Sequence, residues 1–169
     1  AAGEIGLDFF VEGSNQQLQE FYFAEQLKLA RELNLPVLLH IRRAQDIVLK
    51  YLRQFRVCGG IAHAFNGSQQ QAEAFIELNF KLGFGGAMTY TRATRLRKLA
   101  ATLPLENIVL ETDAPDIPPS FLQPGQPNKP EYLPRIAQTL AELRDISLQE
   151  VAQVTTANVM NVLPRLTVK

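Results

Sequence analysis

The sequence is poor in several features that define whole classes of protein. It has one cysteine, Cys58, so an internal disulfide is excluded. Its 17 basic and 17 acidic residues give a formal net charge of zero, so any recognition of phosphate must be local. No apolar run approaches the roughly 18 residues of a membrane span, and no signal-peptide pattern opens the chain. We therefore expect a cytoplasmic protein with no membrane partner.

The length of 169 residues and the hydrophobic content of 46% are enough for one sizeable core. We therefore expect a single domain over residues 1–169. The chain does not begin with Met, and its first eight residues already have the pattern of a strand. From these two features we expect that the sequence is a piece of a longer protein.

Segments that suit strands alternate about five times with segments that suit helices, and short connections join them. This alternation is typical of parallel βαβ units. We expect strands over residues 1–8, 35–41, 57–65, 80–84 and 107–113, and helices over 15–33, 44–55, 68–78, 93–103, 130–144 and 147–162. The irregular stretch 114–130 holds six of the ten prolines, which makes it stiff and long enough to be a functional loop.

The strand predicted near residue 110 leads from an apolar run into two carboxylates, Glu111 and Asp113. Three apolar residues in succession suit a strand that is covered on both faces. Parallel α/β folds place their chemistry at the carboxyl ends of such strands. For Asp113 taken alone, a simple turn-forming role is the more common reading. The polar residues on the other predicted strands distinguish a catalytic role for Asp113 from a turn-forming one.

Four side chains that can bind a metal fall on four different predicted strands, namely Glu4, His40, His63 and Asp113. A lone histidine on an apolar strand is more often a hydrogen-bonded core residue. Four coincidences of the same kind instead favour a divalent metal, because its charge compensates the burial of the carboxylates. Two nitrogen and two oxygen ligands suit zinc, manganese or a similar ion. We interpret Glu111 as an acceptor that orients one of the ligands.

Basic residues also gather near these strand ends, although arginines at the start of a helix usually only solvate its surface. They are Arg42, Arg43, Arg92, Arg95 and Lys129. Arg42 lies two residues beyond His40, and Asn66-Gly67-Ser68 opens a helix whose backbone N–H groups suit an anion. We therefore predict that Arg42 and Ser68 bind a substrate phosphate.

Four motifs together resemble, in order and spacing, those of the TatD family of metal-dependent deoxyribonucleases, in particular its YjjV-like branch. The motifs are Gly3-Glu-Ile-Gly-Leu-Asp8, His40-Ile-Arg42 with Ala44, His63-Ala-Phe-Asn-Gly-Ser68 and Glu111-Thr-Asp-Ala-Pro115. The resemblance implies an α/β TIM barrel, a (β/α)8 metal-dependent hydrolase of the amidohydrolase type. About five βα units, strands four to eight, would be present here, with the first three missing.

The resemblance also implies a site with two divalent metal ions, zinc, manganese, magnesium or similar. Glu4 would bridge them, His40 and His63 would complete one, and Asp113 would bind the other and activate the attacking water. Two departures stand out: the family often has Ser at the position of Asn66, and the His-x-His pair of its first strand does not occur. One metal site is thus nominally complete, and the other lacks two histidines.

The function implied is divalent-metal-dependent cleavage of phosphodiester bonds in DNA, by a protein that is a monomer at full length. Two alternatives stay open at this point. The same metals serve a hydrolase of carboxyl esters or amides, such as an aminoacyl-RNA deacylase. A catalytically incomplete metal-binding barrel would instead serve as a binding module.

Overall fold

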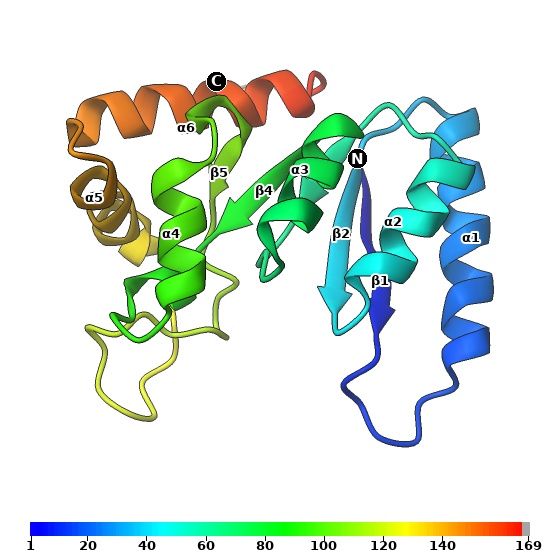
Figure 1. The fold of residues 1–169 in the computed structure, drawn as a ribbon, viewed down its shortest axis with the longest axis horizontal. Coiled ribbons are helices and arrows are strands. Elements are labelled where there is room, and N and C mark those ends of the chain that lie inside the picture. The colour runs from blue at the N-terminus through cyan, green and yellow to red at the C-terminus, as the bar shows by residue number, and fades with distance from the viewer. Residues whose placement is uncertain (167–169) are drawn as a thin grey trace. The chain divides into compact units, whose positions relative to one another are not determined.

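The computed structural model describes residues 1–166, and these divide into two compact units. One unit holds Ala1–Leu82 and residues 162–166, and the other holds Gly83–Asn161. Figure 1 colours the chain from blue to red along its length, so the first unit is mainly blue to green. The expectation of one domain over residues 1–169 is not tested by this division and stays a prediction.

The first unit alternates strands and helices as the sequence predicts, and its strands are parallel. Its elements are β1 (Ala2–Asp8), α1 (Gln16–Glu32), β2 (Val37–Arg42), α2 (Gln45–Gln54), β3 (Gly60–Ala62), α3 (Gln69–Glu77) and the start of β4 (Phe80–Phe84). β2 lies between β1 and β3, and β3 pairs with β4. β3 is shorter than the predicted strand over 57–65, so His63 is the first residue after it.

The second unit continues the pattern from the end of β4. Its elements are η1 (Gly86–Thr89), α4 (Thr94–Thr102), η2 (Leu105–Asn107), β5 (Ile108–Leu110), η3 (Pro130–Tyr132), α5 (Leu133–Arg144) and α6 (Leu148–Val162). The Glu111 N–H donates to the Phe84 carbonyl at 3.2 Å, beside β5. β5 has only three residues, so the paired strand ends before Asp113, although the sequence predicts a strand over 107–113.

Side chains that satisfy free backbone N–H groups fix where three helices begin. The Asn15 side chain accepts from the Leu18 N–H at the start of α1. Ser68 and Gln71 form a reciprocal capping box at the start of α3. The Ser147 Oγ accepts from the N–H three residues on, at 3.0 Å, at the start of α6.

A glycine lets β1 and β2 approach each other at the residue that matters for the site. Gly6 has a φ of +156° and pairs in register with His40. A Cβ at this position would lie 1.8 Å from the His40 carbonyl oxygen, which is far inside van der Waals contact. Any larger residue at position 6 would therefore push β1 away from β2 and displace His40.

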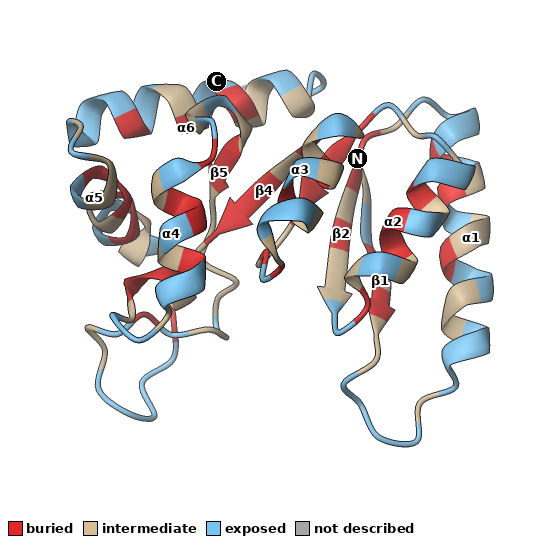
Figure 2. Ribbon diagram, in the orientation of Figure 1, coloured by how far each residue is buried: buried red, intermediate tan, exposed pale blue. Residues whose placement is uncertain are grey.

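The core of the first unit lies between its parallel strands and the helices, where Figure 2 shows the buried residues in red. Leu7, Leu39 and Leu82, on three of the strands, are fully buried. The apolar residues of α1 divide between two faces. Its buried residues are Phe23, Leu27 and Ala30, whereas Leu18, Phe21, Tyr22, Leu29 and Leu33 are exposed. Among residues 1–166, no helix combines the length and the apolar character needed to span a membrane.

Candidate metal centre

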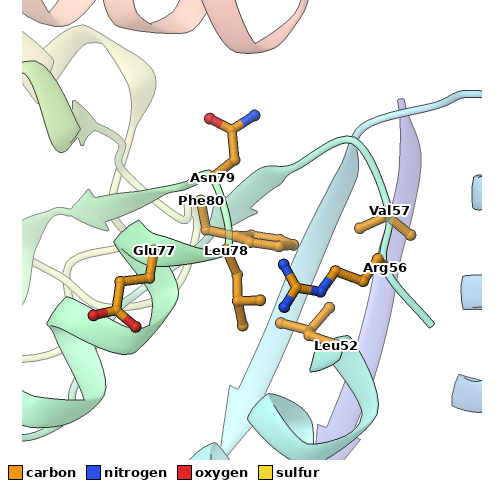
Figure 3. A pocket seen from close by; sticks show the side chains of 7 residues that line it. All are labelled: Leu52, Arg56, Val57, Glu77, Leu78, Asn79 and Phe80. Carbon is orange, nitrogen blue, oxygen red and sulfur yellow. The ribbon is translucent and has the colours of Figure 1, made fainter. Parts of the chain in front are cut away.

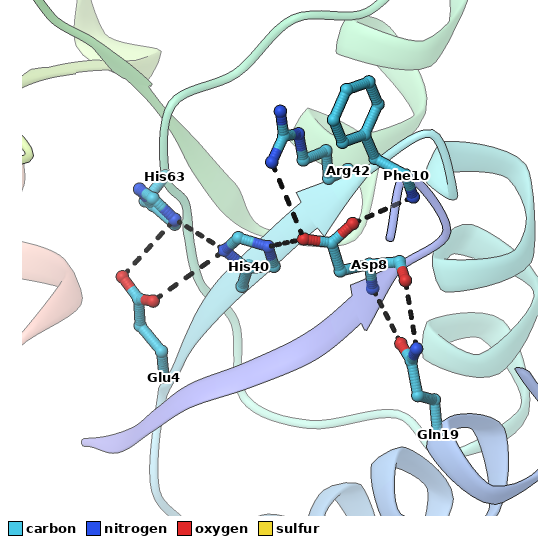
Figure 4. Close-up of polar contacts among 7 residues, drawn as sticks. All are labelled: Glu4, Asp8, Phe10, Gln19, His40, Arg42 and His63. Atoms are coloured by element: carbon cyan, nitrogen blue, oxygen red, sulfur yellow. Dashed lines mark hydrogen bonds and ion pairs between the residues drawn. The ribbon is translucent and has the colours of Figure 1, made fainter. Parts of the chain in front are cut away.

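Three of the four predicted metal ligands come together in the first unit, from β1, β2 and the residue that follows β3. The His63 Nε2 lies 3.3 Å from Glu4 Oε1 and 3.4 Å from His40 Nδ1. The His40 Nδ1 lies 3.9 Å from the other oxygen of Glu4. Figure 4 shows the three side chains pointing toward one another from β1, β2 and the end of β3. Their ligand atoms all lie within 4.8 Å of one another.

The spacing of the two histidine nitrogens and the two Glu4 oxygens fits a metal ion. A tetrahedral metal holds nitrogen and oxygen ligands about 2.0–2.2 Å away, which places the ligand atoms roughly 3.3 Å from one another. The three distances, 3.3, 3.4 and 3.9 Å, lie close to that value. The Glu4 side chain is 50% exposed and the His63 side chain only 14% exposed. The cluster is therefore fixed on the protein side and remains accessible on the other.

The first strand is irregular where it carries Glu4. Ala2 pairs with Val37 and Ile5 with Leu39, so three steps along β1 correspond to two along β2. The extra residue breaks the alternation of the strand and leaves Glu4 exposed beside His40 and His63. Residues after Ile5 pair one to one with β2, up to Asp8 opposite Arg42.

Asp8, which ends the first of the four motifs, is a further functional candidate that the sequence pattern did not predict. Its Oδ2 lies 3.3 Å from His40 Nε2, so the two nitrogens of this ring face two different carboxylates (Figure 4). An Nε2–H that donates to Asp8 leaves the Nδ1 lone pair for a metal, which is the common arrangement around metal-binding histidines. Asp8 therefore fixes the tautomer and the orientation of His40.

The surroundings of Asp8 favour its charged form. Burial raises the pKa of this carboxyl, but the Phe10 N–H, His40 and Arg42 together lower it by more, so the pKa lies below its usual range. The backbone of Asp8 is held as well, because its N–H and carbonyl both bond to the Gln19 side chain, at 2.8 and 3.0 Å. The alternation of side chains along β1 could have identified Asp8 from the sequence, because it places Asp8 on the same face as Gly6. Gly6 in turn pairs with His40 on the neighbouring strand.

Asp113, the fourth predicted ligand, belongs to the second unit, so its place in one centre with the other three stays a prediction. It has a left-handed backbone, with a φ of +56°, and its carbonyl accepts from the Asp116 N–H at 2.8 Å. The simple turn-forming role is thus part of what Asp113 does. Its position depends on a loop rather than on strand pairing, which ends at Leu110.

Asn128 organises that loop, a role that the sequence pattern did not predict. This residue is 3% exposed, and its side-chain amide donates to the carbonyls of Thr112, Asp116 and Ile117 at 2.6 to 3.1 Å. Its own N–H donates to the Pro115 carbonyl at 2.9 Å. One buried amide therefore connects both sides of Asp113 to the far end of the proline-rich stretch. The only sequence signal is one Asn among prolines, which ordinarily indicates a surface turn.

The remaining predicted residues have defined places, and their predicted roles stay predictions. Glu111 lies directly after β5, with its N–H on the Phe84 carbonyl. Ser68 is the N-cap of α3, where its hydroxyl accepts from the Gln71 N–H at 3.1 Å. Arg42 ends β2, is half exposed, and lies 4.0 Å from the Asp8 carboxylate.

A cavity of about 150 Å³ also exists in the first unit, but it lies at the wrong end of the strands. Figure 3 shows its lining, which is Leu52, Arg56, Val57, Glu77, Leu78, Asn79 and Phe80. These residues lie before β3 and at the start of β4, whereas His40 lies in the second half of β2 and His63 directly follows β3. The amino ends of parallel strands in α/β folds serve stability rather than chemistry. The cavity is therefore not a candidate active site.

Comparison with known proteins agrees with this geometry. The sequence profile of the family described as TatD related DNase matches residues 1–164. The chain belongs to this family. An uncharacterized metal-dependent hydrolase of Escherichia coli K12, YjjV, is 46% identical over 154 residues, which are 90% of this chain and 59% of that protein. The family is thus one of metal-dependent hydrolases.

Other relatives support the family and the fold. A Klebsiella pneumoniae protein named 3'-5' ssDNA/RNA exonuclease TatD is 38% identical over 165 residues, 94% of this chain and 63% of its own length. The crystal structure of E. coli YjjV, 43% identical, superposes with a TM-score of 0.90 over 97% of this chain and 63% of that one. A TatD family structure from Entamoeba histolytica, 21% identical, has a TM-score of 0.82 and shows the shared fold. The chain thus spans about three fifths of the length of these relatives.

Proposed function

We propose that this chain carries part of the active site of a divalent-metal-dependent hydrolase that cleaves phosphodiester bonds in DNA. The observation that carries the proposal is the meeting of Glu4, His40 Nδ1 and His63 Nε2 at the spacing of metal ligands. The E. coli relative is named a metal-dependent hydrolase, and the Klebsiella relative an exonuclease on single-stranded DNA and RNA.

Glu4, His40 and His63 would hold the metal, and Asp8 keeps His40 in the tautomer that can bind it. A bound divalent ion supplies charge that stabilises phosphoryl oxygens and lowers the pKa of water. Arg42 would bind a substrate phosphate, because a guanidinium can form paired hydrogen bonds with it. Asp113 would accept the proton of the attacking water, and Glu111 would orient a ligand.

We also propose which part of the barrel this chain forms and how many metal ions the whole protein binds. The five strands correspond to strands four to eight of a (β/α)8 barrel, which agrees with the share of the relatives' length that the chain spans. Two divalent ions, zinc, manganese or magnesium, would act in the whole protein. We propose that this protein is a cytoplasmic monomer.

The test is a hydrolysis assay of the full-length protein, stripped of metal and reloaded with manganese, zinc or magnesium. Single-stranded DNA and an aminoacyl ester are offered in parallel, and bound metal is measured by mass spectrometry. Glu4→Gln is the site variant. Glu77→Gln is the matched control, because Glu77 is exposed and lies at the opposite end of the strands.

We expect metal-dependent cleavage of DNA that Glu4→Gln abolishes and Glu77→Gln retains. Cleavage of the ester but not of DNA would replace the nuclease assignment with the ester or amide hydrolase. Stoichiometric metal without any hydrolysis would favour the catalytically incomplete binding module.

A further inference from the structure

An open hollow of about 780 Å³ lies beside the candidate metal centre, between the end of β2 and the segment that joins β1 to α1. Its lining is Phe9, Phe10, Val11, Glu12, Gly13, Ser14, Gln16, Arg42 and Arg43. Two apolar side chains in it are open to solvent, because Phe10 is 44% and Val11 56% exposed. The volume is in the range of sites that hold a small molecule or a nucleotide.

Two guanidinium groups pack on the ring of Phe10. The Arg42 Cζ lies 3.7 Å and the Arg43 Cζ 4.5 Å from the ring centroid. Such contacts orient a guanidinium and reduce the side-chain freedom lost when it binds an anion. The side chains of two consecutive residues in a strand ordinarily point to opposite faces, whereas here both guanidinium groups contact the same ring. Arg43 achieves this with a left-handed backbone, at a φ of +55°.

This arrangement is joined directly to the metal ligands through Asp8. One carboxylate oxygen of Asp8 faces His40, and the other accepts from the Phe10 N–H at 2.9 Å (Figure 4). The Phe9 N–H also donates to the Arg42 carbonyl at 2.9 Å, which ties the segment to the end of β2. The two guanidinium groups are therefore held close to the candidate metal centre by the Asp8 and Phe9 hydrogen bonds.

The charges in the hollow favour an anion bound at Arg43. The Arg42 guanidinium is 4.0 Å from the Asp8 carboxylate, so part of its charge is already compensated. Within residues 1–166, the Arg43 guanidinium has no carboxylate partner and packs instead on the Phe10 ring. The Glu12 carboxylate in the lining opposes an anion, so its removal should strengthen binding.

We propose that this hollow holds the nucleotide next to the cleaved bond of a polynucleotide. Arg43, together with Arg42, binds its phosphate, and the base packs on the exposed surfaces of Phe10 and Val11. Aromatic and guanidinium surfaces are the common platforms for unpaired bases. This inference rests on the proposed function, and it adds Arg43 and Phe10 to the residues that bind the substrate.

The first test measures equilibrium binding of a short fluorescent oligothymidylate to the full-length protein in EDTA, where cleavage cannot occur, over a series of salt concentrations. We expect Arg43→Gln to weaken binding about tenfold and to lower the slope of log affinity against log salt by about 1. Arg43→Lys should keep the slope, because the charge remains. Arg56→Gln, an exposed arginine at the other end of the strands, is the control.

The second test uses the same oligonucleotide with one base after another replaced by an abasic sugar. Phe10→Ala should weaken binding of the intact strand about 5- to 100-fold, the range for loss of one stacked base. It should weaken binding of the strand that is abasic at the affected position by less, because only the orientation of Arg42 and Arg43 is then lost. Phe10→Trp should restore binding of the intact strand. Glu12→Gln should tighten binding of both strands.

An unchanged salt slope in Arg43→Gln would overturn the inference, as would equal losses for intact and abasic strands in Phe10→Ala. The same holds if the wild-type protein does not bind the oligonucleotide. Binding with the expected variant effects, but without hydrolysis once metal is restored, would support the hollow as a nucleotide site. That result would contradict only the proposed nuclease activity.

Discussion

The two units bring acidic residues to the end of a strand by different means. In the first unit, parallel pairing fixes His40 and Asp8, because β1 and β2 keep their register from Ile5 to Asp8, and Glu4 lies in the irregular step just before. In the second unit, pairing stops at Leu110, and Asp113 stands three residues farther along. There a buried amide, Asn128, and a turn hydrogen bond from Asp116 hold the chain.

The difference shows how a rigid and an adjustable part of a site can be built. Backbone ladders hold metal ligands within tenths of an ångström, which the geometry of coordination requires. Loops are more mobile than the strands they connect, and they commonly carry the groups that act on substrate. We infer that the paired strands serve metal binding and that the Asn128 loop serves catalysis. Variants in each unit can separate metal binding by the paired strands from catalysis by the Asn128 loop.

Asp113→Asn should have the largest effect, on turnover. Its proposed work is to accept a proton in the transition state, so we expect kcat to fall about 10²- to 10⁴-fold with little change in KM. Steady-state kinetics of the full-length protein on single-stranded DNA measure this, and bound metal is determined on the same samples. Asp116→Asn, in the same loop and exposed, is the control. A normal kcat would remove Asp113 from the mechanism.

His63→Ala should cause the next largest effect, on metal affinity. Loss of a ligand should weaken binding by more than the about 10- to 100-fold that supporting residues cost. Calorimetric titration with zinc measures this. The chain has two histidines, so His40→Ala should behave alike. Affinity retained in both variants would show that the cluster is an ordinary group of polar residues.

Asn128→Ala should lower the free energy of unfolding by about 1 to 3 kcal/mol, because it removes the donor from three part-buried hydrogen bonds to carbonyls. It should also lower kcat by loosening Asp113, while metal affinity at the first unit stays unchanged. Urea unfolding and zinc titration separate the two effects. Gln126→Ala, an exposed residue of the same loop, is the control. Loss of metal in Asn128→Ala would contradict the division between the units.

Asp8→Asn should have the smallest effect, an about 10- to 100-fold loss of metal affinity, as for other residues that orient a ligand. The amide can still bond to His40, so the fold should survive. Asp46→Asn, a surface carboxylate that bonds to the Gln71 amide, is the control. An unchanged zinc affinity would mean that Glu4 and His63 alone orient His40.

Much of the fold could be predicted because local patterns and caps agree with it. The alternation of strands and helices is confirmed, and so are the starts of α3 and α6 at Ser68 and Ser147. Strand lengths could not be predicted, because residue type does not mark the end of a strand: Ala64 and Phe65 come soon after β3, whereas polar residues follow β5. β3 and β5 each have three residues, so His63 and Asp113 follow their strands rather than end them.

For the site, residue type and order along the chain were enough to select Glu4, His40 and His63, because few other residue types bind metals and each histidine comes directly after the apolar residues of a strand. The tertiary structure alone decided that Asp8 orients His40, that Phe10 gathers Arg42 and Arg43, and that Asn128 holds the loop around Asp113. These contacts join residues of different segments or depend on single positive φ angles. Hydrophobic periodicity carries no information about either.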